Sequence, residues 1–323
     1  MATSDSTVLV TGANGFIGRL LCDALAASGR RPRKAVRASV PGLPGTIAVG
    51  DIGPGTDWRT VLEGARCVMH LAARTHVLRE TAADPLAEYR RINVAGTERL
   101  ARAAAAQGVR RFVFLSSVKV HGERTDGRPY AEAVTPRPED AYGISKLEAE
   151  HVLARVAVET GLDVVVLRPP LVYGPGVKGN FLRLMRLVAR GMPLPLGSID
   201  NRRSLVYAGN LADAIVKVIG SPQAAGKTYL VSDGEDVSTP GLVRALAQAL
   251  GVKARVWPIP VAALKLAATL AGRSADLARL TDSLQVDTSR MRRELDWRAP
   301  FTLTQGIEQT AQWYLDKPGD SSH

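Results

Sequence analysis

The sequence predicts a doubly wound α/β fold, in which a parallel β-sheet is covered by helices on both faces, with a smaller C-terminal lobe. Two observations support this prediction. Short apolar runs rich in valine, leucine and phenylalanine alternate with helix-like stretches through the first half of the 323-residue chain. Such alternation is typical of buried parallel strands joined by crossover helices. After Arg168 the regular alternation ends, and prolines and glycines cluster.

The first half is expected to contain six strands. Apolar runs bounded by turn residues predict strands at 7–11, 34–37, 46–49, 66–71, 112–116 and 164–168. Helical patterns run to Leu25, over 84–107 and over 142–160, and the last two stop at Gly108 and Gly161, which are typical C-terminal signals. In the second half we expect helices at 181–190 and 239–251, a strand at 229–231, and an irregular stretch at 191–203.

The composition is that of an ordinary globular protein, with 46% hydrophobic and 23% charged residues. Residues 1–6 are polar, so no signal peptide is expected. The apolar stretch 261–272 is interrupted by Lys265 and is too short to span a bilayer. It is amphipathic, and we expect it to dock on its own lobe rather than on a membrane. The sequence therefore predicts a cytoplasmic protein without stable membrane insertion.

Charge and cysteine content narrow the class of partner. The net charge is +11, but aromatics make up only 5% and no basic run is interleaved with them, which argues against nucleic acid and favours a diphosphate-bearing small molecule. Cys22 and Cys67 have no metal-ligand partner at suitable spacing. They are expected to be reduced core thiols, and no metal site is predicted.

A glycine-rich turn follows the first strand and opens the first helix, with the sequence GANGFIG over 12–18. Glycines at this place permit a tight turn and let backbone N–H groups approach a pyrophosphate, which the positive end of the helix also attracts. This placement predicts a Rossmann-type dinucleotide site, made by Gly12, Asn14, Gly15, Phe16, Ile17 and Gly18.

The end of the second strand bears on the choice of nicotinamide cofactor. NAD-binding sites commonly carry an acidic residue there, but the sequence over 34–39 is KAVRAS and has no carboxylate. Arg37 and Ser39 can hold a 2′-phosphate, because a guanidinium matches phosphate geometry. Alternatively, Arg37 stacks on adenine. The sequence favours NADP(H), and NAD(H) is the alternative.

These signals set the expected domain boundaries. Residues 1–175 are assigned to a dinucleotide-binding Rossmann domain, and part of 204–232 is expected to return to it. Residues 176–317 are assigned to a substrate-binding lobe, and 318–323 to a disordered tail.

Three residues form a candidate catalytic group. Tyr142 and Lys146 lie four apart at the start of a predicted helix and therefore share one face. A nearby ammonium favours the phenolate of a tyrosine and brings its pKa closer to the working range. Ser117 stands at the carboxyl end of the fifth strand, where ligands of such sheets bind. Serine can hydrogen-bond a reacting oxygen, tyrosine can exchange its proton, and lysine can hold the cofactor ribose.

Taken together, these motifs resemble the extended short-chain dehydrogenases/reductases over nearly the whole chain. The matching segments are the 12–18 loop, Asp51-Ile52, HLAA at 70–73, NVAGT at 93–97, Ser116-Ser117, Tyr142 with Lys146, and RP…VYGPG at 168–176. The resemblance implies that Asp51 contacts adenine and that Ile52, Leu71, Ala72 and Ala73 line the cofactor. It also implies that Asn180 and Arg203 reach the sugar and diphosphate of a substrate, and it suggests a homodimer that pairs helices 84–107 and 142–160.

Departures from the family pattern argue against two of the reactions known in the family, dehydration and decarboxylation. The 4,6-dehydratases carry an Asp-Glu pair after the active-site serine or threonine, and related decarboxylases carry a glutamate there, but this chain has Val118 and Lys119. The reaction that remains is the transfer of a hydride and a proton at a single carbon. Lys119 is expected to point toward a substrate phosphate or toward solvent.

The sequence favours an NAD(P)-dependent 4-keto reductase of a UDP-linked 4-keto-6-deoxy-N-acetylhexosamine. The alternative is a UDP-hexose or UDP-N-acetylhexosamine 4-epimerase with tightly bound NAD. Two further alternatives are a reductase of non-sugar carbonyls and a non-catalytic NADP(H)-binding regulator. Tyr142 and Lys146 argue against the regulator, and Arg203 together with the basic charge argues against an apolar substrate.

Overall fold

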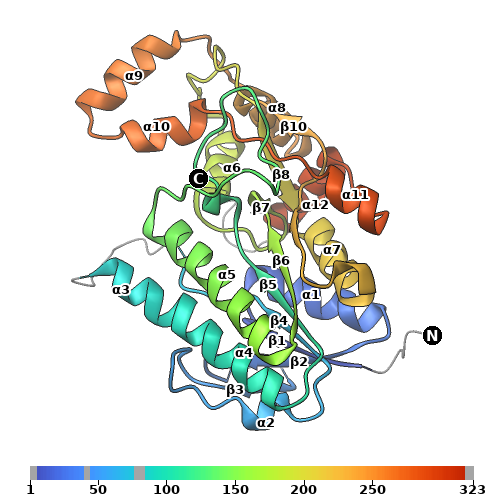
Figure 1. The fold of residues 1–323 in the computed structure, drawn as a ribbon. Helices are drawn as coiled ribbons and strands as arrows, with labels where there is room; N and C mark the ends of the chain where they lie inside the picture. Colours follow the sequence, from blue (N-terminus) through green and yellow to red (C-terminus); the bar gives the residue numbers. More distant parts are fainter. Residues whose placement is uncertain (1–5, 40–43, 76–83, 317–323) are drawn as a thin grey trace.

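The protein is built around a seven-stranded, entirely parallel sheet with the strand order β3-β2-β1-β4-β5-β6-β9 (Figure 1). The computed structural model describes residues 6–39, 44–75 and 84–316, so the tail predicted at 318–323 lies outside the described residues. The sheet confirms the doubly wound α/β fold. Its strands are β1 (Thr7–Thr11), β2 (Arg31–Val36), β3 (Thr46–Ala48), β4 (Cys67–His70), β5 (Arg111–Leu115), β6 (Asp163–Arg168) and β9 (Thr228–Leu230).

Side chains of the sheet alternate between two hydrophobic cores, because successive residues of a strand point to opposite faces. Val8 and Val10 of β1 belong to the core that contains the helices α1 (Phe16–Ala27), α7 (Ala208–Gly220) and α11 (Ser289–Leu295). Leu9 belongs to the other core, which contains α2 (Arg59–Leu62), α4 (Gly96–Ala106) and α5 (Ala141–Thr160). Cys22 and Cys67 are free and buried in the first core, as predicted.

The stretch predicted as one helix over 84–107 is continuous but not uniform. It consists of α3 (Pro85–Tyr89), a π-helical segment η1 (Arg90–Ala95), and α4. Asp84 caps its start by accepting a hydrogen bond from the backbone N–H of Ala87 (3.0 Å). The π segment widens the helix next to the candidate site, as π-bulges at functional sites often do. Helical periodicity in the sequence does not reveal it.

A second, three-stranded sheet organises the C-terminal lobe. It consists of β7 (Leu171–Tyr173), β8 (Arg203–Tyr207) and β10 (Asp236–Val237), with β7 parallel and β10 antiparallel to β8. The helices α6 (Gly179–Ala189), α8 (Thr239–Ala249) and α12 (Leu303–Leu315) share one core with it. This small sheet was not predicted.

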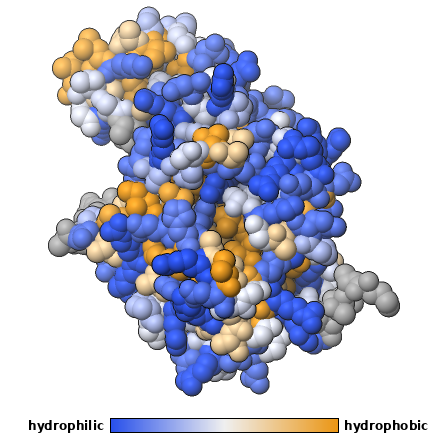
Figure 2. All heavy atoms as spheres, in the orientation of Figure 1, coloured by the Kyte–Doolittle hydropathy of each residue, from blue (hydrophilic) through white to orange (hydrophobic). Residues whose placement is uncertain are grey.

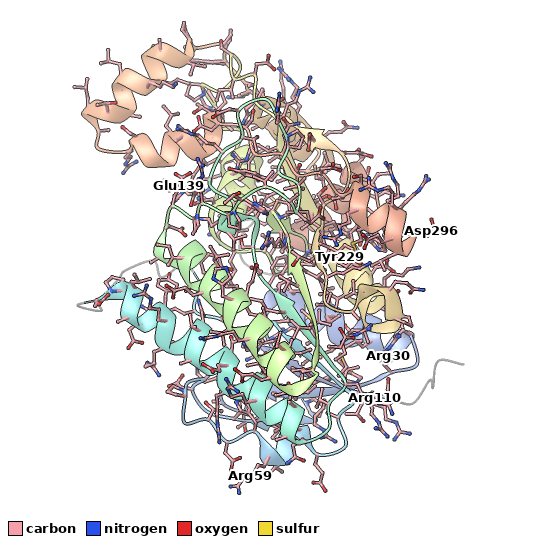
Figure 3. All side chains as sticks on the ribbon, viewed as in Figure 1. Arg30, Arg59, Arg110, Glu139, Tyr229 and Asp296 are labelled. Atoms are coloured by element: carbon pink, nitrogen blue, oxygen red, sulfur yellow. The ribbon has the colours of Figure 1, made fainter. Side chains whose placement is uncertain are left out.

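The chain returns to the large sheet after the lobe has begun. Within residues 204–232, β8 belongs to the small sheet, whereas α7 packs on α1 and β9 pairs with β6. Helix α11 packs in the same core of the large sheet as α1 and α7, although the predicted domain boundary assigned residues 176–317 to the lobe. The hydroxyl of Tyr229, labelled in Figure 3, donates a hydrogen bond to Glu294 of α11 (3.0 Å), which joins α11 to the edge strand β9.

Some of the basic residues lie far from the candidate site. Arg30 and Arg110 directly precede β2 and β5, so they lie at the amino-terminal edge of the sheet, away from the strand ends that carry the candidate site (Figure 3). None of the described helices combines the length and the hydropathy that a membrane span requires.

Candidate active site

The loop between β1 and α1 packs closely against the neighbouring backbone and leaves the start of α1 open. Gly12 has a φ of +68°, and a Cβ there would lie 3.1 Å from the backbone nitrogen of Ala72. A Cβ on Gly18 would lie 2.2 Å from the carbonyl oxygen of Gly12, so only glycine lets α1 begin this close to the loop. Gly15 is the N-cap of α1, and no side chain bonds the first turn there. The positive end of α1 is therefore presented directly at the strand ends.

A buried histidine fixes this loop to the neighbouring strand. The Thr97 hydroxyl donates its proton to the carbonyl oxygen of Asn93 (2.6 Å), so it can only accept from His70. His70 therefore carries its proton on Nε2, which donates to Thr97 (3.1 Å), and its Nδ1 accepts from the Thr11 hydroxyl (2.7 Å). Burial lowers the pKa of His70 to about 3, which keeps the ring neutral. Backbone N–H groups of Leu71 and Ala72 donate to the same Thr11 hydroxyl (both 3.2 Å). The ends of β1 and β4 are thus held in fixed register beside Gly12.

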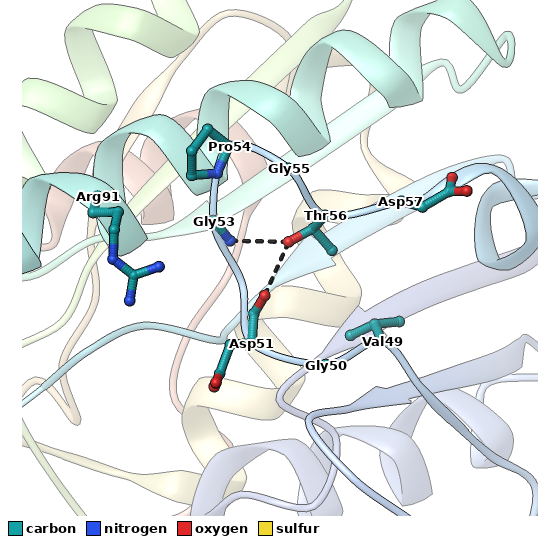
Figure 4. A pocket seen from close by; sticks show the side chains of 9 residues that line it. All are labelled: Val49, Gly50, Asp51, Gly53, Pro54, Gly55, Thr56, Asp57 and Arg91. Carbon is teal, nitrogen blue, oxygen red and sulfur yellow. Dashed lines mark hydrogen bonds between the residues drawn. The ribbon is translucent and has the colours of Figure 1, made fainter.

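The ends of β2 and β3 form the other part of this region. The Arg37 guanidinium pairs with Asp51 (Nε–Oδ1 2.9 Å), and both side chains are largely exposed. An open pocket of about 480 Å³ lies beside Asp51. Its loop is held by the Thr56 hydroxyl, which accepts from Gly53 N–H (2.9 Å) and donates to the Asp51 carbonyl oxygen (3.0 Å), as Figure 4 shows. The pocket is lined by Val49, Gly50, Asp51, Gly53, Pro54, Gly55, Thr56, Asp57 and Arg91.

The three predicted catalytic residues come from adjacent elements. Ser117 follows β5 and caps the short 3-10 helix η2 (Val118–Val120), accepting a hydrogen bond from the backbone N–H of Lys119 (3.2 Å). Tyr142 and Lys146 stand on the first turns of α5. Helix α5 packs against η2 so closely that a Cβ on Gly143 would lie 2.7 Å from the Lys119 carbonyl oxygen. Sequence positions far apart are thereby brought to one end of the sheet.

Burial dominates the electrostatics of this group. It lowers the pKa of Lys146 to about 7, against the opposing effect of the Glu150 carboxylate. The Lys146 ammonium group lies 4.1 Å from the centre of the Phe114 ring. Burial, with smaller effects of Asp140 and Tyr89, raises the pKa of Tyr142 above its ordinary value. The expected lowering of the tyrosine pKa is therefore not seen, because desolvation favours the protonated phenol.

Lys119 does not have a free ammonium group for a substrate phosphate. Its Nζ atom lies 2.5 Å from Glu123 and 2.6 Å from Asp140, and its side chain is only 17% exposed. Asp140 also caps α5 by accepting a hydrogen bond from the backbone N–H of Gly143 (2.7 Å). Of the two orientations expected for Lys119, the structure therefore shows neither. Lys119 instead steadies the start of the helix that carries Tyr142.

The two residues expected to reach the substrate lie on the lobe. Asn180 is exposed on the first turn of α6. Arg203 begins β8 and donates to the Asp282 carbonyl oxygen (2.9 Å), and burial lowers its pKa. Phe16 joins the two parts of the molecule, because it packs against the lobe core and a Cβ on Gly176 would lie 3.4 Å from its ring.

Sequence reasoning missed a buried ion-pair network behind the catalytic group. Arg168 at the end of β6 pairs with Glu150 (2.5 Å), and their side chains are only 8% and 7% exposed. Arg168 also donates to His121 Nε2 (2.9 Å), and the Ser116 hydroxyl donates to Glu150 (2.5 Å). The available signal was Glu150 itself, a carboxylate one turn beyond Lys146 on the buried face of a helix.

Asn93 is a second residue to which the sequence assigned no role. Its side-chain amide donates to the Ser145 hydroxyl and to the Arg74 carbonyl oxygen (both 3.0 Å), and its Oδ1 accepts from the Arg74 N–H (2.8 Å). It is buried in the π segment η1. Asn93 therefore ties the segment after β4 to helix α5, on which Tyr142 stands.

Comparison with known proteins identifies the family. The model of the NAD dependent epimerase/dehydratase family matches residues 8–232. The chain is 46% identical to UDP-glucose 4-epimerase of Vibrio cholerae over 98% of both chains. Among solved structures, MoeE5 in complex with UDP-glucuronic acid and NAD is 28% identical, with a TM-score of 0.77 over 96% of this chain and 99% of that one.

A Thermus thermophilus UDP-glucose 4-epimerase in complex with NAD is 25% identical, with a TM-score of 0.76, and covers 96% of this chain and 99% of its own. These likenesses extend across both the large sheet and the lobe. They confirm the resemblance to extended short-chain dehydrogenases/reductases and the assignment as a nucleotide-sugar enzyme. The chain belongs to the NAD dependent epimerase/dehydratase family.

Proposed function

We propose that this protein is a UDP-hexose 4-epimerase that keeps NAD bound through turnover. The observation that carries the proposal is the 46% identity to the Vibrio cholerae UDP-glucose 4-epimerase over 98% of both chains. That relation supports the epimerase better than the 4-keto reductase that the sequence favours. The reductase remains the second candidate, because both reactions need the same hydride and proton transfer at C4.

The residues present fit a dinucleotide cofactor. Gly12 and Gly18 let the loop pack tightly against Ala72 and the start of α1, and the first turn of α1 carries no acidic side chain that would repel a pyrophosphate. Asp51 lines the neighbouring pocket and pairs with Arg37. A 2′-phosphate beside Asp51 would meet a like charge. This pairing supports NAD(H) rather than the NADP(H) that Arg37 alone suggests.

The proposed mechanism assigns proton transfer to Tyr142 and hydrogen bonding to Ser117. A bound nicotinamide supplies the site that accepts a hydride from C4 and returns it. Tyr142 takes the proton of the C4 hydroxyl as the C4–H bond breaks, and it gives the proton back when hydride returns to the opposite face. Ser117 donates a hydrogen bond to the same oxygen. Because burial favours the neutral phenol, Tyr142 would need a nearby positive charge to act as a base, and Lys146, one turn further along α5, would supply it when protonated.

The test separates the two candidates. Purified protein is denatured and the released dinucleotide is identified, and the native protein is given UDP-galactose and UDP-glucose in turn. Interconversion without added cofactor, together with released NAD, is the expected result. Consumption of NADPH or NADH with a UDP-linked 4-keto-6-deoxy-N-acetylhexosamine, without interconversion of UDP-hexoses, would instead establish the reductase.

Three further proposals accompany the epimerase. Arg203 and Asn180 contact the substrate, since both stand on the lobe side of the site. The protein acts in the cytoplasm, where UDP-sugars and reduced thiols are found.

Two copies pair through α4 and α5, where Val158 is 87% exposed. Light scattering of the wild type and of Val158→Glu tests the dimer, which the charge is expected to weaken.

A further inference from the structure

Helix α9 (Val261–Leu270) carries an apolar surface that the rest of the described chain leaves uncovered. Its inner side is half-buried against the lobe and against α10 (Ser274–Thr281), yet none of its residues is buried. Leu266 and Leu270 are 65% and 82% exposed. Figure 2 shows hydrophobic atoms gathered at this projecting end of the molecule. The exposed apolar residues of α9 are Ala262, Ala263, Leu266, Ala267 and Leu270.

These residues form one continuous face. Positions 262, 266 and 270 follow each other at intervals of four, and 263 and 267 lie beside them, so all point to the side opposite the packed residues Val261 and Leu264. Lys265 and Thr269 are the only polar residues of α9. A helix that is apolar on nearly every side needs a second apolar contact. The expected docking of α9 on its own lobe therefore covers only one of its two apolar faces.

The chain segment that carries this face is basic. Over 252–280 the sequence has five basic residues, namely Lys253, Arg255, Lys265, Arg273 and Arg279, against the single acidic residue Asp276. Trp257, just before α9, is 58% exposed. A second copy of the chain on this face would bring like charges together. An apolar helix face with an exposed tryptophan and a basic border matches a bilayer surface that carries anionic lipid.

We propose that the α9–α10 projection binds reversibly to membranes that contain anionic phospholipid. The leucine and alanine face of α9 enters the boundary between headgroups and acyl chains, and the basic side chains lie at the headgroups. With ten residues, α9 is too short to cross the bilayer. The proposal is independent of the reaction catalysed, because none of these residues belongs to the candidate active site.

Vesicle co-sedimentation tests the proposal. The wild type is expected to bind vesicles of phosphatidylcholine and phosphatidylglycerol in equal parts more tightly than vesicles of phosphatidylcholine alone, and added salt should weaken binding. Leu266→Gln/Leu270→Gln should weaken binding about tenfold or more, because it removes the two most exposed leucines of the face. Leu315→Gln, at a leucine that is 50% exposed on α12, is the matched control and should bind as the wild type does.

Two further readouts make the result unambiguous. Trp58 and Trp297 are buried and Trp313 is partly buried against the lobe core, so a blue shift of tryptophan emission on binding should come mainly from Trp257 and should disappear in Trp257→Phe. Unchanged turnover of UDP-sugar by the double variant shows that it is folded. Failure of the wild type to bind mixed vesicles, or equal binding by the double variant, would overturn the proposal. Self-association that the double variant abolishes would assign the face to a second copy instead.

Discussion

Replacing Gly18 by alanine tests the close approach between α1 and the glycine loop. The added Cβ would lie 2.2 Å from the Gly12 carbonyl oxygen and 2.8 Å from the Ala13 Cα. The helix and the loop must then separate by about 1 Å, and overpacking of this kind costs about 1–3 kcal/mol. The gain in helix propensity offsets about 1 kcal/mol of that cost. We expect a net loss of up to about 2 kcal/mol, which lowers the Tm of a chain of this length by up to about 3 °C.

The larger effect should fall on the cofactor, because the displaced atoms are those expected to face the pyrophosphate. A displacement of about 1 Å at a binding element can reduce turnover about 100-fold. NAD released per chain on denaturation is measured beside the Tm and the rate of UDP-hexose interconversion. Gly220→Ala is the control, since its Cβ would meet only the movable end of Arg30 at the end of α7. Full NAD content and unchanged Tm in Gly18→Ala would refute the reasoning.

Three other predictions concern the site and the residues that support it. Tyr142→Phe removes the proton-transferring hydroxyl and should lower the rate of interconversion about 10²–10⁴-fold while the NAD content stays unchanged. Glu150→Gln leaves Arg168 buried and unpaired and should lower the free energy of unfolding in urea by about 3–5 kcal/mol, whereas Glu148→Gln, in an exposed pair, should cost under about 1 kcal/mol. His70 has a pKa of about 3 when folded and 6.5 when unfolded, so the unfolded chain binds the extra proton between these values. Acidification from pH 7 to pH 5 should therefore lower stability by about 2 kcal/mol, and His70→Gln should remove that part of the pH dependence.

Each of these expectations can fail separately. Normal interconversion by Tyr142→Phe would remove the proposed proton carrier. Equal stability of Glu150→Gln and Glu148→Gln would show that the buried network contributes little. An unchanged pH dependence in His70→Gln would mean that other groups, such as the buried His121 with its pKa lowered to about 4 by burial, dominate acid destabilisation.

The large sheet was predictable because its signals are local. Most of its strands are short apolar runs, and the glycine loop lies in a seven-residue segment directly after the first of them. The exception is β2, whose polar first half (residues 31–33) precedes the predicted start at residue 34. The small sheet escaped prediction because β7 and β10 have three and two residues and are defined by pairing with the distant β8. Strands this short leave no periodic pattern.

In the candidate site, too, the features with local sequence signals were predictable and those that depend on tertiary packing were not. Ser117, Tyr142 and Lys146 could be located from motif and strand order. The partners of Lys119 could not, because they depend on how the turn before α5 folds back onto η2. The pKa of Tyr142 was also beyond the sequence, since it depends on how completely the phenol is desolvated.

The return of the chain to the large sheet has a consequence for folding. A fragment that ended at residue 175 would lack β9 and α7, so β6 would become an uncovered edge and the core beside α1 would be open to water. Long exposed edges of this kind recruit other chains. The native edge strand β9 has only three residues. We therefore expect the half of the molecule that contains the large sheet to complete its core only after Met291 and Leu295, which are made late in synthesis, have emerged.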